Sequence, residues 1–189
     1  MKKWILAIFA LTLLAAATFV QGQNTKTGEL KTVSFVDLKR YGGTWFEIAR
    51  YANKAQKQCF GNTTATYNFK PDGEVEIVNK CLTKDGKTED ATGTAKVVDT
   101  QTNAKLKGSF AWLSSAPYWV IDLDEDYQYA VVGNPDRKYL WILSRTPEMS
   151  AATYEKILRK IEIAGYNPAK LEKTPQKLET VKGSVVRKQ

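Results

Sequence analysis

Apolar and polar residues alternate with a period of two along most of the chain between Gly43 and Arg145. Such alternation is typical of strands that have one face in an apolar core and the other in water. Turn-forming residues, such as those at 71–73, divide this region into short segments of similar length. We therefore expect eight strands, at residues 43–52, 63–70, 74–81, 91–98, 104–112, 117–123, 127–133 and 138–145.

The last three segments are apolar on both faces, so their outer side needs a cover. The residues that follow repeat apolar positions at helical spacing, from Tyr154 through Ile157 and Ile161. This pattern predicts one amphipathic helix at about 150–164, with Ser150 as its N-cap and Gly165 at its end. The chain is therefore expected to be all-β, with a single helix packed on the wall of a barrel or sandwich.

Residues 1–22 have the pattern of a cleaved signal peptide, in which Lys2 and Lys3 precede an apolar run and then small residues. The apolar run is short for a membrane span, although a retained anchor is the alternative interpretation. No cysteine lies near the expected cut, so we expect an exported protein without a lipid anchor. We expect a loose segment at 23–34, one domain at 35–170 and a basic tail at 171–189.

The formal net charge of +8 falls to +6 when Lys2 and Lys3 are removed with the leader. The remaining positive charge is scattered except in the tail. The sequence shows no row of basic residues on a known nucleic-acid-binding module, so a nucleic-acid partner is not expected. The tail is either simply solvated or weakly attracted to anionic membrane surfaces.

The chain contains no histidine, which excludes Ser-His-Asp and Cys-His catalysis, a His-ligated haem and most zinc sites. We therefore expect no cofactor, no metal and no catalytic residue. Two enzymatic alternatives stay open, a thiol isomerase and an acid–base catalyst that uses Glu47, whose position in the alternation indicates a buried carboxylate.

Two cysteines, Cys59 and Cys81, flank the expected hairpin of 63–70 and 74–81. In an exported chain this favours a disulfide, worth about 3 kcal/mol. A regular hairpin would place Cys81 opposite Thr63, so the bridge requires residues 59–62 to leave the ladder and fold back. A free nucleophilic thiol is the alternative.

Three short motifs occur in the order expected for the closed end of a small up-and-down barrel. They are Gly43-Thr44-Trp45, Asp126-Tyr127 and an Arg145 that closes the last strand. Gly43 allows a tight turn, Trp45 fills the floor, and Arg145 covers its ring by cation–π contact. With eight strands and one helix, the chain resembles the lipocalin family over about residues 35–170. Within the family it is most similar to bacterial outer-membrane lipocalins and apolipoprotein D, through Ala65-Thr66-Tyr67 and residues 116–119.

The resemblance implies an eight-stranded antiparallel barrel that holds one small ligand. If Arg145 points inward, strand alternation also turns Trp141 inward, about 13 Å above the floor. The resemblance implies ligand contacts at Tyr67 and Trp141. The further candidate ligand-binding residues are Ala65, Leu106, Phe110, Trp112 and Arg50.

Two of these roles remain open. Trp112 either belongs to the wall or caps the mouth as an exposed lid. Arg50, Lys54 and Lys57 either receive an anionic headgroup or are solvated.

The resemblance also implies a function, which is binding and storage or transport of a small hydrophobic ligand. A fatty acid or lysophospholipid is expected, with a possible role in cell-envelope lipid maintenance in a bacterium. We expect a monomer or weak homodimer in the periplasm or outside the cell. The competing interpretations are a lipocalin-like isomerase and an envelope protein that docks on membranes through its tail.

Overall fold

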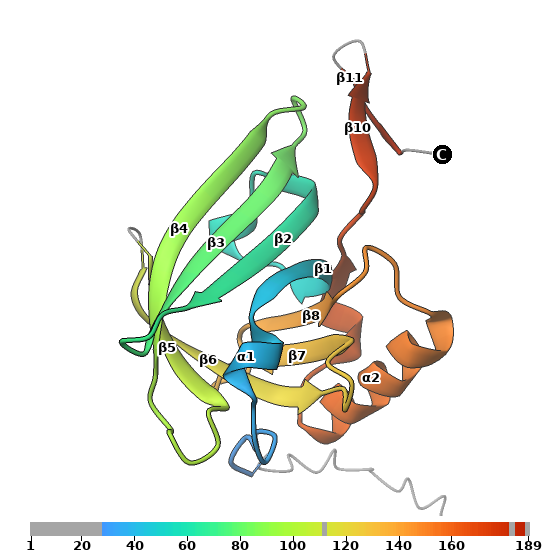
Figure 1. The fold of residues 1–189 in the computed structure, drawn as a ribbon. Coiled ribbons are helices and arrows are strands. Elements are labelled where there is room, and N and C mark those ends of the chain that lie inside the picture. The colour runs from blue at the N-terminus through green and yellow to red at the C-terminus, as the bar shows by residue number, and fades with distance from the viewer. Residues whose placement is uncertain (1–27, 111–112, 182–183, 188–189) are drawn as a thin grey trace, which may run out of the picture.

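Eight antiparallel strands form a closed barrel in the computed structural model, which describes residues 28–110, 113–181 and 184–187 (Figure 1). Each strand pairs with the next, and β1 pairs with both β8 and β2 to close the ring. The barrel strands are β1 (Gly43–Tyr51), β2 (Cys59–Phe69), β3 (Glu74–Thr83), β4 (Thr88–Val97), β5 (Lys105–Phe110), β6 (Leu113–Leu123), β7 (Tyr129–Gly133) and β8 (Leu140–Ser144). The predicted fold class is therefore confirmed, whereas the expected leader at 1–22 lies outside the described residues.

The expected strands at 104–112 and 117–123 place a break between them, with turn-forming residues at 114–117, and this prediction is wrong. These residues belong to β6, where Pro117 lies opposite Lys107, and Phe110 pairs with Leu113. Pairing of β6 with β7 begins only at Trp119, so Pro117 lies on a part of β6 that has β5 as its one neighbour. A proline with its fixed φ is compatible with an extended strand at such a position.

The closed end of the barrel is covered by α1 (Leu38–Tyr41), which begins at the N-cap Asp37. Tyr41 and Trp45 are fully buried there in one apolar cluster. The preceding residues were expected to be loose, but Leu30 is buried and the amide of Val33 donates to Val120 O at 3.0 Å. The described part of that segment, from residue 28, is thus packed on the barrel.

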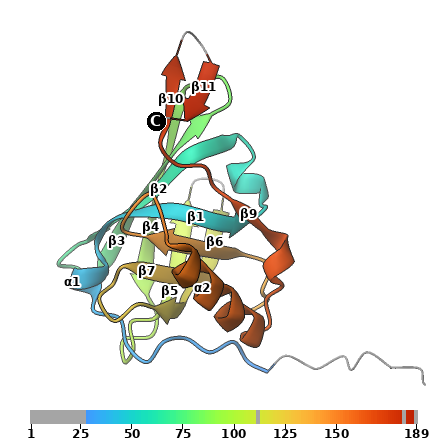
Figure 2. The same cartoon turned by 90° about the vertical axis from the view of Figure 1, so that its right-hand side faces the viewer.

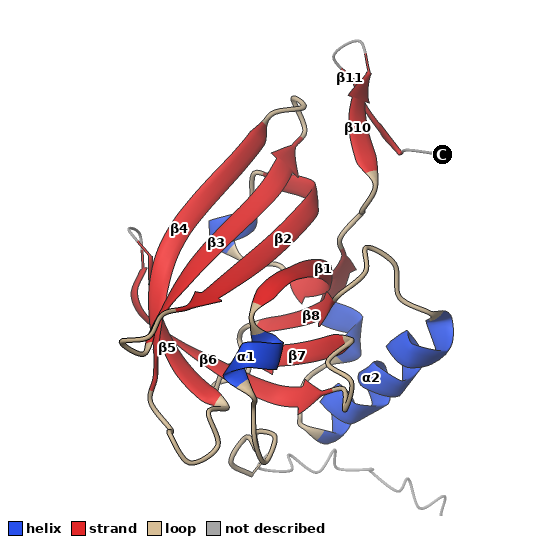
Figure 3. Ribbon diagram, in the orientation of Figure 1, coloured by secondary structure: helices blue, strands red, loops and turns tan. Residues whose placement is uncertain are grey.

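One helix, α2 (Ala151–Ile163), lies against the outside of the barrel wall (Figures 2 and 3). Ile157 and Ile161 are fully buried against outward residues of the wall, including Val131 and Ile142. Ser150 caps its N-terminus, as predicted, by accepting from the amide of Thr153. The apolar outer face of the last strands explains why a helix covers this side. In the described ranges, no helix has the length and apolar character needed to cross a membrane.

The segment expected as a basic tail instead completes the barrel sheet, which corrects the boundary at residue 170. Pairing of β1 with β2 ends at Phe46, and the second half of β1 pairs with β9 (Leu171–Lys173). An unpaired strand edge leaves backbone donors and acceptors exposed. The returning chain satisfies those groups where β2 diverges from β1.

Shorter elements complete the description. A 3-10 turn, η1 (Lys54–Gln56), lies in the β1–β2 connection, and a second, η2 (Pro168–Lys170), precedes β9. Beyond β9, β10 (Leu178–Val181) and β11 (Ser184–Arg187) form a separate two-stranded hairpin. Both views show this hairpin projecting beyond the barrel (Figures 1 and 2).

Candidate functional site

The barrel encloses a cavity of about 190 Å³ that is separated from the floor by the buried cluster around Trp45. Four of the predicted wall residues line it: Ala65, Tyr67, Phe110 and Trp141. Further apolar surface comes from Ile77, Ala116, Tyr118 and Leu143. This arrangement, a mainly apolar concave wall with a few polar groups, is typical of small-molecule sites.

Leu106 does not line the cavity, in contrast to the prediction. It has the expected inward direction but is packed in the interior cluster at 3% exposure, opposite Tyr118 and Val97. Gly108, two residues along β5, is the next inward position and does line the cavity. Strand alternation gives the direction of a side chain, whereas the depth of the floor decides whether it meets the cavity. Trp112 lies outside the described residues.

The floor has the predicted plug. The guanidinium of Arg145 lies 3.7 Å from the centroid of the Trp45 ring and donates to the carbonyls of Thr44, Arg40 and Tyr41. The Trp45 indole N–H donates to Tyr41 O at 2.8 Å. In the second floor motif, the Tyr127 hydroxyl accepts from the amide of Asp37 at 2.8 Å, and the amide of the neighbouring Asp126 donates to Asp124.

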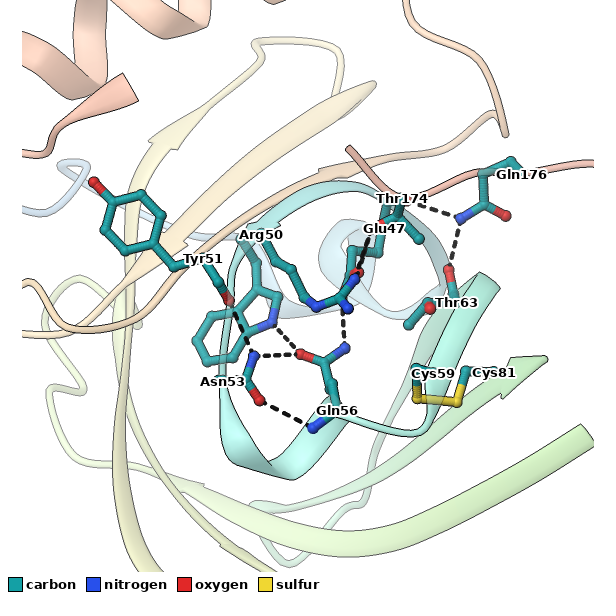
Figure 4. A network of polar contacts seen from close by, with 11 residues as sticks. Glu47, Arg50, Tyr51, Asn53, Gln56, Cys59, Thr63, Cys81, Thr174 and Gln176 are labelled. Atoms are coloured by element: carbon teal, nitrogen blue, oxygen red, sulfur yellow. Dashed lines mark hydrogen bonds and ion pairs between the residues drawn. A yellow bond between two sulfur atoms is a disulfide. The ribbon is translucent and has the colours of Figure 1, made fainter. Parts of the chain in front are cut away.

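A buried carboxylate lies beside the cavity, as predicted for Glu47. Its side chain is 3% exposed and accepts from Arg50 Nη1 at 2.8 Å and from Gln56 Nε2 at 2.7 Å (Figure 4). The Thr174 hydroxyl also donates to it. Gln56 in turn accepts from the Trp141 indole N–H at 3.0 Å. A chain of hydrogen bonds therefore joins the cavity wall to the C-terminal segment.

Arg50 is not presented to a ligand in this arrangement. It is not among the residues that line the cavity, because its guanidinium is engaged by Glu47 and Thr174. A β-bulge between Glu47 and Ala49 explains its position. The extra residue turns Ala49 outward into the helix-covered cluster and places Arg50 opposite Trp141.

The other two basic candidates, Lys54 and Lys57, are exposed. They do not line the cavity either.

The C-terminal segment closes the gap where β1 and β2 diverge. The Gln176 side-chain amide donates to the backbone carbonyls of Glu47 and Thr63, at 2.8 and 3.0 Å (Figure 4). Asn62 then holds Leu178 by two hydrogen bonds, one to each of its backbone groups. The Gln176 side chain thus bridges β1 and β2 where the two strands separate, beside the mouth of the cavity.

Cys59 and Cys81 form the predicted disulfide, with their Cα atoms 5.5 Å apart. The predicted distortion is also present. Between Cys59 and Thr64 the β2–β3 register shifts twice, and Asn62 adopts a positive φ of 49°. Without these shifts Cys81 would lie opposite Thr63, and Cys59 would be out of reach. Both cysteines line the mouth side of the cavity.

Three tyrosine hydroxyls form a chain at the deep end of the cavity. Tyr118 donates to Tyr67 at 2.9 Å, and Tyr41 lies 2.7 Å from Tyr118. Burial raises the pKa of Tyr67 to about 12 and holds the pKa values of Tyr41 and Tyr118 well above their ordinary range. The three phenols are therefore neutral hydrogen-bond donors and acceptors at physiological pH.

Sequence analysis missed Gln56, Tyr118, Thr174 and Gln176 as parts of this site. The sequence carried a signal for Tyr118 alone, in the motif at 116–119, but the wrongly placed turn hid its inward direction. Thr174 and Gln176 reach the site through the return of the chain to β1, which no local pattern indicates.

Comparison with known proteins agrees with this fold. The family model described as "Lipocalin-like domain" matches residues 36–176. The chain therefore belongs to this family. The match extends six residues beyond the predicted boundary at 170 and includes Thr174 and Gln176, in agreement with their place in the barrel.

The chain is similar to proteins from a plant, a bacterium and a mammal. It is 39% identical over 160 residues to temperature-induced lipocalin-1 of Arabidopsis thaliana, which covers 80% of this chain and 86% of the relative. It is 37% identical over 166 residues to the outer membrane lipoprotein Blc of Escherichia coli, covering 85% and 93%. Apolipoprotein D of Mus musculus is 29% identical over 181 residues, covering 89% and 94%.

Solved structures support the fold. Insecticyanin from the tobacco hornworm Manduca sexta superimposes with a TM-score of 0.64 at 20% identity, over 77% of this chain and 84% of that one. Lobster apocrustacyanin A1 gives a TM-score of 0.59 at 18% identity, over 73% and 78%. At these identities the likeness concerns the fold alone.

Proposed function

We propose that this protein is exported, binds a small hydrophobic ligand in the barrel cavity, and stores or carries that ligand in the periplasm or outside the cell. The expected ligand is a fatty acid or lysophospholipid. The protein would then serve in the maintenance of cell-envelope lipids. The observation that carries the proposal is the cavity of about 190 Å³ walled by Tyr67, Phe110 and Trp141. Burial of apolar ligand surface supplies the affinity, at about 25 cal/mol per Å² before the costs of association.

A binding role without catalysis is supported by the state of the two enzymatic candidates. Cys59 and Cys81 are joined, so neither presents a thiol. Glu47 accepts hydrogen bonds from Arg50, Gln56 and Thr174, and this arrangement holds the carboxylate as a structural acceptor.

The disulfide also bears on localisation. Such bonds persist in oxidising compartments, which supports export. The bridge uses both cysteines of the given sequence, which supports a protein without a cysteine-linked lipid anchor. We propose a periplasmic or secreted protein that is not lipid-anchored, although Blc is named an outer membrane lipoprotein.

Titration with fatty acids and lysophospholipids, followed by tryptophan fluorescence and native mass spectrometry, tests the binding function. We expect a one-to-one complex and a change in emission. In Trp141→Phe the change in emission should largely disappear while the complex persists. The matched control is Trp119→Phe, because Trp119 packs in the outer cluster under α2. Absence of any complex with every lipid, together with unchanged emission, would overturn the proposal.

A further inference from the structure

The cavity has polar groups at both ends of an apolar wall. Thr63 and Tyr67 lie four residues apart on β2, and both residues line the cavity. An extended strand separates two such positions by about 13 Å. Between them the lining is apolar, with Ala65, Ile77 and Leu143.

At the deep end, the direction of the tyrosine hydrogen bonds fixes what Tyr67 can offer. Each hydroxyl has one hydrogen to donate. Since Tyr118 donates to Tyr67, the contact between Tyr41 and Tyr118 must be donated by Tyr41. The Tyr67 hydrogen then has no acceptor among the residues that the structure describes.

The opposite direction would leave the hydrogen of Tyr41 without an acceptor. Tyr41 is 2% exposed and does not line the cavity, so neither a ligand nor water in the cavity could take that hydrogen. A buried donor without a partner is costly. Tyr67, in contrast, lines the cavity, so the favoured direction presents its O–H there as a donor.

At the mouth end, the Thr63 hydroxyl is also without a partner. Thr63 is 5% exposed, lines the cavity, and its Oγ1 makes no hydrogen bond within the described part of the chain. Its backbone carbonyl is already used by Gln176. The hydroxyl has almost no exposed surface in this conformation, so it meets a group on the ligand when the side chain rotates toward the cavity that the residue lines.

The charged residues of the lining indicate the charge of that group. They are Glu47, Lys80, Glu89 and Asp90. Glu47 is compensated by Arg50, and Lys80 lies directly opposite Asp90 across β3 and β4. Carboxylates outnumber ammonium groups, so the mouth favours a neutral polar group over a lone anion.

We infer that the preferred ligand is an elongated neutral amphiphile with a polar group at each end. A hydroxyl or carbonyl oxygen accepts from Tyr67 at the deep end, and a hydroxyl meets Thr63 near the mouth. This inference rests on the proposed function, since it concerns the same cavity, and among hydrophobic ligands it favours a neutral molecule over an ionised fatty acid.

The test compares 1-decanol with 1,10-decanediol, which differ in the second hydroxyl. The measured quantity is the ratio of their Kd values in the wild type, in Tyr67→Phe and in Tyr154→Phe. Tyr154→Phe is the matched control, because it removes a phenol hydroxyl from α2 outside the barrel. We expect the preference for the diol to fall about three- to tenfold in Tyr67→Phe and to stay unchanged in the control.

Two further measurements extend the test. Thr63→Val should weaken both alcohols by a similar factor, because both place a hydroxyl near the mouth. In Thr63→Val, bound 2-decanone should show a carbonyl stretch at lower frequency than in hexane, because Tyr67 is then the donor that reaches it. This measurement keeps the test intact if Tyr67→Phe does not fold.

Binding with the same ratio in the wild type and Tyr67→Phe, or an unshifted carbonyl stretch, would overturn this inference and leave the proposed function standing. Failure of all three probes and of the lipids to bind would overturn both.

Discussion

Arg145 lies over the ring of Trp45, with its guanidinium carbon 3.7 Å from the ring centroid, and joins the start of the first strand to the end of the last. The same group donates to three backbone carbonyls, those of Arg40, Tyr41 and Thr44. Burial lowers the pKa of Arg145 without removing its charge. The contact therefore fixes the floor of the barrel and leaves the cavity untouched.

We predict that Arg145→Ala lowers the free energy of unfolding by about 2 kcal/mol, because it removes the cation–π contact and leaves carbonyls without a donor. Arg145→Lys should recover only part of this loss, since an ammonium cannot match the fork of donors. Urea denaturation measures the change. Ligand affinity of the folded variants should equal that of the wild type, and a large loss of affinity would place Arg145 in the binding site.

The disulfide should contribute about 3 kcal/mol, because its cysteines are 22 residues apart in sequence. The double variant Cys59→Ser/Cys81→Ser should unfold at lower denaturant concentration than the oxidised wild type. Adding a reductant to the wild type should reproduce the shift, and the double variant should not respond to it. Alkylation of the unreduced, denatured protein should label no thiol, and labelling of either cysteine would contradict the bridge.

Stability should fall at alkaline pH because of the buried tyrosines. Tyr67 has an ordinary pKa of 10.0 in the unfolded chain and about 12 in the fold. Above pH 10 the unfolded state loses the proton first, so this contribution is complete below pH 10 and is lost progressively up to about pH 12. Its size is about 3 kcal/mol.

Thermal unfolding from pH 8 to 12 checks this dependence. Tyr67→Phe should be less sensitive over the upper part of that range, while Tyr139→Phe serves as the control, because the Tyr139 side chain is exposed. Equal pH dependence of the wild type and Tyr67→Phe would show that the Tyr67 phenol ionises freely in the fold.

The bridge made by Gln176 should matter more than its position near the C-terminus suggests. Gln176→Ala leaves the carbonyls of Glu47 and Thr63 without their donor, and we expect a loss of about 1–3 kcal/mol. Lys177→Ala is the neighbouring control, because its ion pair with Glu148 is exposed and surface pairs contribute little. Urea denaturation measures the free energy of unfolding of both variants. If Gln176→Ala is as stable as Lys177→Ala, the bridge is dispensable.

Truncation distinguishes the two parts of the C-terminal segment. Deletion after Leu178 removes most of the projecting hairpin and should leave the barrel stable. Deletion after Lys170 removes β9, Thr174 and Gln176, and should destabilise the barrel because the edge of β1 is left open. The membrane-docking alternative is therefore tested with the shorter deletion, since the longer one damages the barrel.

The local pattern of apolar and polar residues was sufficient to predict most of the architecture. The alternation in β5 and the helical spacing of Ile157 and Ile161 each arise because one face of the element packs against apolar neighbours. The period of the apolar residues therefore predicts the element directly. The distortion at the disulfide could also be predicted. A regular hairpin pairs Cys81 with Thr63, which leaves Cys59 too far from Cys81 to form a bond. Pro117 misled the prediction, since a turn-forming residue lies within a strand where pairing is one-sided.

The sequence by itself determined the barrel, its floor motif, the covering helix and four of the wall residues, because each depends on spacing along a single strand or helix. Tertiary structure alone decided that Leu106 lies below the cavity and that a bulge turns Arg50 toward Glu47. It also decided that residues 171–178 return to the gap between β1 and β2, and that Tyr41, Tyr118 and Tyr67 share one chain of hydrogen bonds. These features depend on distances between residues far apart in the chain, and no local period encodes such distances.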